Sequence, residues 1–105
     1  MTFRSYGHKP WGHYLNIFDA PYTKVKEILI KPGEAPSYQY HHKRSEIWVI
    51  VKGTAEVKLD GEVKTYGQGD VIHIPVKSKH QAKNIGDDDL VFIEVQLGEY
   101  FGEDD

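Results

Sequence analysis

The stretch TAEVKLDGEVKTY, residues 54–66, indicates the fold class. Two short runs, residues 54–59 and 62–66, place apolar or β-branched residues at alternate positions, which is the pattern of a half-buried β-strand. Between the runs stands Asp60-Gly61. This dipeptide suits a type I′ turn, because both central residues of that turn need a positive φ. The stretch therefore predicts an antiparallel β-hairpin.

Four further segments have the character of strands. They are short, rich in β-branched or aromatic residues, and separated by Gly, Pro, Asn and Asp; they cover residues 24–30, 46–51, 70–75 and 90–97. Apolar residues nowhere recur at helical spacing, so we expect no helix longer than a turn or two. Many short strands with frequent turns predict an all-β sandwich or barrel. The length of 105 residues predicts a single domain over residues 1–105.

The composition excludes several classes of protein. Thirteen basic and sixteen acidic residues leave a net charge of −3, which argues against a nucleic-acid-binding surface. The sequence contains no run of about 20 apolar residues, and its first residues lack the apolar core of a secretory signal. It has no cysteine, so disulfide and thiolate chemistry are absent. We therefore expect a cytoplasmic protein that binds neither nucleic acid nor membrane.

The segment SYQYHHKRSEIW, residues 37–48, contains three candidate metal ligands. In an extended chain Gln39 and His41 would share one face, and a turn would then bring Glu46 back beside them. His80 is a fourth candidate. Two imidazoles, one carboxylate and one amide oxygen suit a divalent metal such as Mn, Fe, Co, Ni or Zn. The alternative from this pattern is a polar turn whose histidines are simply exposed.

Two spaced motifs resemble those of the cupin superfamily. The first consists of glycine, a pair of ligands one residue apart, a glutamate and a second glycine, here Gly33, Gln39, His41, Glu46 and Gly53. The second consists of glycine, proline, glycine, histidine and asparagine, here Gly69, Pro75, Lys77, His80 and Asn84. Gln39 replaces the first histidine, and Lys77 replaces the middle glycine of the second motif. The resemblance implies a double-stranded β-helix, or jelly-roll barrel, with a divalent metal held by Gln39, His41, Glu46 and His80.

The chain also resembles the type II phosphomannose isomerase family of cupins. It shares KPWG at residues 9–12, a spaced pattern over residues 37–48 and the tail IEVQLGEYFGEDD at residues 93–105. Lys9 stands where the family has arginine, Ile47 where histidine is common, and Gln81 where arginine often follows the metal histidine. The resemblance implies a metal-dependent isomerase that interconverts mannose 6-phosphate and fructose 6-phosphate through an enediolate.

Roles for individual residues follow from this activity. A general base must carry one proton between adjacent sugar carbons, and Glu46 is the candidate, with Glu94 as the second. Phosphate requires cations or backbone amides, and Arg44 fits this need best. The residues expected to bind the small sugar-phosphate substrate are Arg44, Lys79, Lys9, Ser37, Glu94 and Gln96.

Two other functions agree with the same residues. Two histidines and one carboxylate also suit an Fe(II)-dependent cupin oxygenase. A non-catalytic cupin that binds a sugar or sugar nucleotide would need no general base. Whichever function holds, we expect a homodimer, because small barrels of this kind leave strand edges that a partner subunit covers.

Overall fold

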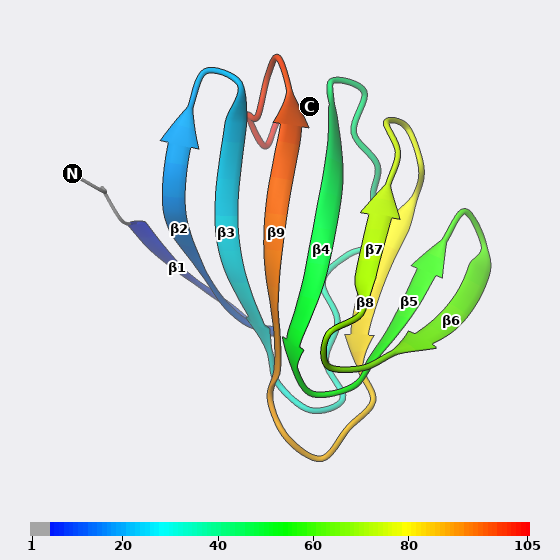
Figure 1. Cartoon of the computed structure of the whole chain (residues 1–105). Helices are drawn as coiled ribbons and strands as arrows, with labels where there is room; N and C mark the ends of the chain where they lie inside the picture. The colour runs from blue at the N-terminus through cyan, green and yellow to red at the C-terminus, as the bar shows by residue number, and fades with distance from the viewer. Residues whose placement is uncertain (1–4) are drawn as a thin grey trace.

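The computed structural model describes residues 5–105, which form nine β-strands and no helix (Figure 1). The strands are β1 (Ser5–Lys9), β2 (Gly12–Ala20), β3 (Thr23–Ile30), β4 (Arg44–Lys52), β5 (Ala55–Leu59), β6 (Glu62–Tyr66), β7 (Val71–Ile74), β8 (His80–Asn84) and β9 (Leu90–Gly98). The prediction of an all-β fold is confirmed. Within residues 5–105, no helix is long and apolar enough to cross a membrane.

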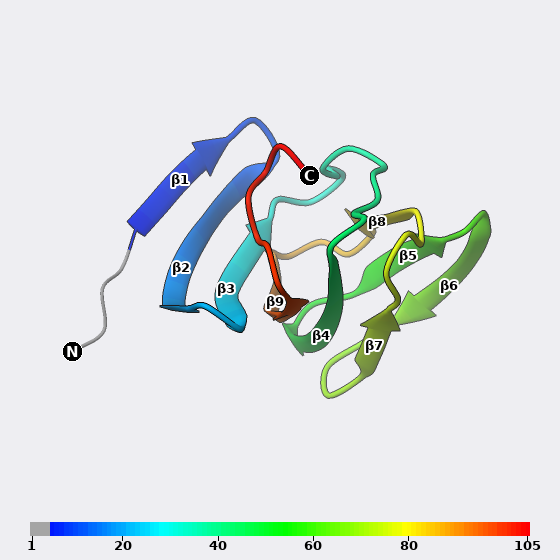
Figure 2. The same cartoon turned by 90° about the horizontal axis from the view of Figure 1, so that it is seen from above.

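The strands form two antiparallel sheets. The larger sheet has the order β1-β2-β3-β9-β4-β7, and the smaller has the order β6-β5-β8. The apolar core lies between them, because buried residues of β3, β4, β7 and β9 cluster with Ala55 and Val57 of β5 and Ala82 of β8. Figure 2 shows the larger sheet curving around one side of the molecule, with β5 and β6 on the other. This two-sheet arrangement is the jelly roll that the sequence predicted.

The inward face of the larger sheet is apolar at one end and polar at the other. Alternate residues of β4 and β9 are buried, as expected for strands with one face on the core. In register, Ile30 lies opposite Leu90, whereas Lys26 lies opposite Glu94. Trp48 pairs with Glu94 on the other side of β9. The polar end of this face is where the functional site forms.

The predicted hairpin is present as β5 and β6. Asp60 has φ of 49° and Gly61 has φ of 84°, as a type I′ turn requires. Sequence patterns did not reveal β1, β2 or β8. A register shift between Asn16 and Phe18 breaks the alternation of β2, and β8 (HQAKN) contains no β-branched residue. Both features hide a strand from a pattern based on alternation and propensity.

The expectation that alternate residues of this segment share one face is confirmed, since Ser37, Gln39 and His41 all line one pocket, but the segment is not a regular strand. Residues 37–43 form no strand, and only Gln39 makes an isolated bridge, to His80. The backbone pairing with β8 does not continue beyond Gln39, because the next carbonyl that could pair bonds to another segment. The His41 carbonyl accepts a hydrogen bond from Lys77 N at 2.7 Å. A loop contact, the bond from Lys77, therefore holds the His41 backbone in place.

Two positions of the second motif have structural roles. Lys77 has φ of 70°, the left-handed region that favours glycine, which explains why glycine is usual at this position of the motif. The Asn84 side chain is fully buried. Its Nδ2 donates to the carbonyls of Ile30 and Asp88, both at 2.8 Å. Because Ile30 belongs to the larger sheet, Asn84 ties the two sheets together.

Candidate metal centre and pocket

Three buried side chains converge at the polar end of the barrel. His41 precedes β4, Glu46 lies on β4 and His80 begins β8, and one ligand atom from each lies within 4.8 Å of the others. Nε2 of His41 is 3.6 Å from Oε2 of Glu46. Nε2 of His80 is 3.8 Å from Oε1 of the same carboxylate. Residues from both sheets thus form one candidate metal site.

The three side chains fit a divalent metal. Two imidazole nitrogens and a carboxylate within 4.8 Å of one another are a donor set that divalent metals accept. Nδ1 of His80 lies 2.9 Å from the Ser78 carbonyl, so with the proton on Nδ1 the lone pair of Nε2 faces Glu46. Trp48 Nε1 donates to Oε1 of Glu46 at 2.9 Å. Such bonds orient metal ligands in known sites.

Both histidines are held in the neutral form that binds metal. Burial is the main cause that lowers the pKa of His41, and the charges of Arg44 and of His80 lower it further. Burial also lowers the pKa of His80, against the opposing effect of its bond to Ser78. Neutral imidazoles at neutral pH keep their lone pairs available for coordination.

Arg44, predicted to bind phosphate, lies directly against the metal ligands. It is only 4% exposed. Its Nε donates to Oε2 of Glu46 at 3.0 Å, and its Nη2 lies 3.0 Å from Nε2 of His41. The guanidinium thus bonds to two of the three candidate ligand atoms. A bound metal would need these atoms, so Arg44 would have to withdraw from them.

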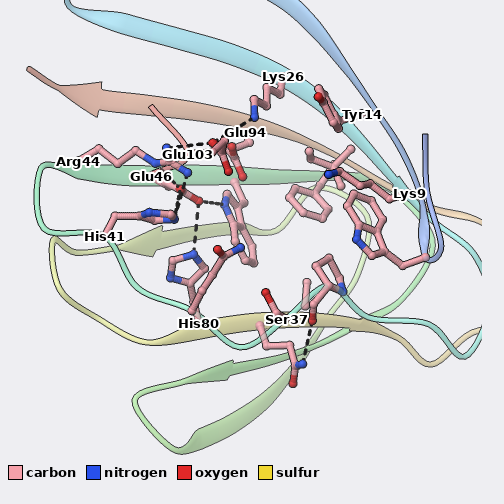
Figure 3. Close-up of a pocket in the computed structure, with 18 residues that line it drawn as sticks. Lys9, Tyr14, Lys26, Ser37, His41, Arg44, Glu46, His80, Glu94 and Glu103 are labelled. Carbon is pink, nitrogen blue, oxygen red and sulfur yellow. Dashed lines mark hydrogen bonds and ion pairs between the residues drawn. The ribbon is translucent and has the colours of Figure 1, made fainter. Parts of the chain in front are cut away.

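A pocket of about 270 Å³ opens from the triad toward the β1–β2 hairpin (Figure 3). Its lining includes several of the predicted site residues, namely Lys9, Ser37, Gln39, Arg44 and Glu94. Lys9 lies on the far side of the pocket from His41. Gln39 lines the pocket but is exposed, and its backbone is bonded to that of His80 at 2.8 and 3.1 Å. Gln39 therefore lies on the pocket wall beside the triad, and its role as a metal ligand stays a prediction.

Two predicted substrate contacts lie outside the pocket lining. Lys79 is exposed, because neighbouring residues of an extended chain point to opposite sides and His80 points inward. Lys79 is therefore not part of the pocket wall, and its contact with a substrate stays a prediction. Gln96 is fully buried and donates from Nε2 to Oε2 of Glu94 at 2.6 Å. It supports a pocket residue and does not line the pocket itself.

Glu94 is a buried carboxyl group beside the metal ligands. It is 8% exposed. Burial raises the pKa of Glu94 to about 7, and the charge of Glu46 contributes in the same direction. A carboxyl group with this pKa exists in both protonation states near neutral pH, as a general acid–base needs.

The raised pKa of Glu94 predicts a pH-dependent stability in the metal-free protein. The folded state holds this proton more tightly than the unfolded state, whose carboxyl titrates near 4.5. The stabilising contribution is therefore complete below about pH 4.5 and is lost as the pH rises through about 7. Relative to that of Glu94→Gln, the free energy of unfolding of the wild type should fall by on the order of 1–3 kcal/mol between these two pH values.

Urea denaturation of the metal-free wild type and Glu94→Gln, at several pH values from 5 to 8, measures this difference. The exposed Glu99→Gln serves as the control for loss of a carboxylate. Parallel profiles for wild type and Glu94→Gln would contradict the raised pKa.

Sequence reasoning missed two charged residues of the pocket, Lys26 and Glu103. Lys26 had a signal, because it shares a strand face with the apolar residues Ile28 and Ile30, and a charge in such a row needs a partner. Glu103 had none. It lies in an irregular tail, and tertiary contacts alone bring it to the pocket.

The fold and the buried triad define a cupin. Solved structures similar to the chain include an RmlC-like cupin from Shewanella frigidimarina, with TM-score 0.83 and 19% identity over 96% of this chain and 87% of that one. KdgF from Halomonas sp. matches with TM-score 0.81 and 21% identity over 95% and 89% of the two chains. At these identities the likeness establishes the fold alone.

The chain belongs to the family described as mannose-6-phosphate isomerase C-terminal, which residues 1–105 match. Mannose-1-phosphate guanylyltransferase of Escherichia coli (strain K12) is 45% identical over 98 residues, 93% of this chain and 20% of the relative. The alginate biosynthesis protein AlgA of Pseudomonas putida is 43% identical over the same shares. The chain thus spans about a fifth of the length of these curated relatives.

Proposed function

We propose that this chain is a metal-dependent isomerase that interconverts mannose 6-phosphate and fructose 6-phosphate. One observation carries the proposal: a buried His41–Glu46–His80 triad shares a pocket with a carboxyl group, Glu94, whose pKa is about 7. Membership of the isomerase C-terminal family supports the same chemistry. The names of the curated relatives agree with a role in sugar metabolism.

The reaction needs a group that moves a proton between two adjacent carbons of the sugar. Removal of that proton leaves negative charge on the sugar oxygens. A divalent metal held by His41, Glu46 and His80 would supply Lewis-acid stabilisation of this charge. The protein itself must remove the proton from one carbon and return it to the next.

We assign the proton transfer to Glu94 in preference to Glu46. Both oxygens of Glu46 already accept hydrogen bonds, Oε1 from Trp48 and Oε2 from Arg44, and a carboxylate that also binds metal is a weak base. Glu94 lines the same pocket and titrates near neutral pH. In its ionised form it can accept the proton from the second carbon of mannose 6-phosphate and deliver it to the first carbon.

Proton NMR in D₂O tests the proposal. Mannose 6-phosphate is incubated with the chain loaded with Mn, Co, Ni, Zn or, without oxygen, Fe(II). We expect fructose 6-phosphate to appear, with deuterium at its first carbon and at the second carbon of recovered mannose 6-phosphate. Glu94→Gln and His41→Ala should abolish conversion, whereas His73→Ala, an exposed histidine of β7, should not. Absence of conversion with every metal would refute the isomerase.

One observation favours a second candidate, a sugar-binding cupin without catalytic activity. The Arg44 guanidinium already bonds to Glu46 and His41, so the chain satisfies two candidate metal ligands with its own cation. A binding protein would bind mannose 6-phosphate in the same NMR experiment and leave it unconverted.

A further inference from the structure

The C-terminal tail folds back over the polar end of the barrel. Figure 2 shows this tail, residues 99–105, leaving β9 and running toward the loop that precedes β4. The carboxylate of Asp105 accepts hydrogen bonds from the backbone amides of His42 and Lys43, both at 3.0 Å. Lys43 Nζ lies 4.9 Å from the centre of the Tyr100 ring. These contacts hold the tail beside the pocket.

The tail places one carboxylate against two cations of the pocket (Figure 3). Oε2 of Glu103 lies 3.3 Å from Nη1 of Arg44 and 3.7 Å from Nζ of Lys26. The side chains of Arg44 and Lys26 are 3% and 10% exposed, whereas that of Glu103 is 65% exposed. A carboxylate that is open to solvent therefore meets two buried positive charges.

The electrostatics show that this position attracts an anion. Burial acts to raise the pKa of Glu103, but the charges of Lys26 and Arg44 outweigh it and lower the pKa below its usual value. Buried cations are costly unless they are paired. Glu103 supplies this pairing from a segment that contributes to neither sheet.

A phosphate monoester matches the two cations better than Glu103 does. Arg44 also pairs with Glu46, but a metal held by Glu46 would neutralise the charge of that carboxylate. Lys26 and Arg44 would then present two positive charges to Glu103. Glu94, which also interacts with Lys26, would add a negative charge only in its ionised form. A phosphate monoester carries about −1.5 to −2 at neutral pH and offers three charged acceptor oxygens, whereas the hydroxyl oxygens of an uncharged sugar carry no charge.

We infer that Lys26 and Arg44 form the phosphate subsite of the pocket, and that Glu103 occupies it until a phosphorylated ligand displaces the tail. The inference rests on the proposed function, since it assigns a place to the phosphate of the same ligand. It makes the tail a competitor of that ligand. Removing the charge of Glu103 should therefore strengthen binding, although no contact with the ligand is added.

Isothermal titration of the metal-loaded full chain with mannose 6-phosphate, and separately with mannose, tests the competition. Glu103→Gln should bind mannose 6-phosphate about threefold more tightly than the wild type, because exposed ion pairs are weak and easily replaced. Its affinity for mannose should not change. The matched control is Glu99→Gln, which makes the same change at an exposed position of the same tail and should bind as the wild type.

A second variant tests the cations. Lys26→Met keeps the length of the side chain and removes its charge, and it should bind mannose 6-phosphate about tenfold more weakly. Lys83→Met, on the exposed side of β8, is the control and should bind normally. Thermal melting of each variant establishes that it is folded before titration.

The inference is overturned if Glu103→Gln, or Lys26→Met, binds mannose 6-phosphate as the wild type does, or if no form binds it. All forms are titrated in the Glu94→Gln background, in which conversion is expected to be abolished, so the affinities are separate from the isomerase test. Altered affinities without conversion would refute the isomerase and retain the subsite. Conversion with unaltered affinities would refute the subsite and retain the isomerase.

Discussion

Replacing His80 with alanine is expected to lower the affinity of the chain for Zn²⁺ or Mn²⁺ by at least about 100-fold. Loss of a group that merely orients a ligand already costs about 10–100-fold, and His80 contributes one of three candidate ligand atoms. It is also the only one of the three on the smaller sheet. The variant would leave a pair of ligands on one side of the site.

Competition with a chromophoric chelator measures this affinity. His73→Ala is a suitable control, because His73 is exposed on β7. The substitution removes an imidazole that lies outside the site. Thermal melting of the metal-free proteins separates loss of metal affinity from loss of folding. Equal affinity of the wild type and His80→Ala would show that the triad is not the metal site.

Replacing Trp48 with alanine is expected to lower the free energy of unfolding by about 3–5 kcal/mol. The side chain is 3% exposed, and its ring lies 4.8 Å from that of Phe92 between centroids. Its removal leaves a cavity in the core and takes a hydrogen bond from the buried Glu46. Because small domains have only about 5–15 kcal/mol in total, this single change approaches the limit of stability.

Urea denaturation of the metal-free chain gives the measurement, with Tyr22→Ala as the control at a 68% exposed aromatic residue. Trp48→Phe separates the two effects of the substitution. Phenylalanine keeps most of the packing but cannot donate a hydrogen bond to Glu46. Trp48→Phe should therefore be more stable than Trp48→Ala, and it should bind metal about tenfold more weakly than the wild type. A loss below about 1 kcal/mol in Trp48→Ala would contradict the packing described here.

The features that could be predicted from the sequence are those encoded over short stretches. Asp60-Gly61 specifies its turn by itself, and the motif spacing identified His41, Glu46 and His80, which the fold brings together. The extended strand expected at residues 37–41 is absent, because His41 is placed by a bond from Lys77, more than thirty residues away. Alternation cannot detect such a contact.

Charged residues were harder to assign than the metal ligands. The spacing of the motif predicts that Arg44 lies near the site, but it does not predict which atoms the guanidinium bonds to. In the structure it pairs with Glu46 and His41. Lys26 could have been noticed as a charge on an apolar strand face. Glu103 could not, since its position depends on how the tail docks after the barrel has formed.

The place of β9 has a consequence for synthesis of the chain. Although β9 follows the other eight described strands in the sequence, it lies in the middle of the larger sheet, between β3 and β4. A ribosome adds about 5–20 residues per second. The edges of β3 and β4 that pair with β9 therefore remain without backbone hydrogen bonds to it for seconds. Unpaired edges readily join those of other chains. The nascent protein is therefore most prone to aggregate just before β9 (Leu90–Gly98) emerges.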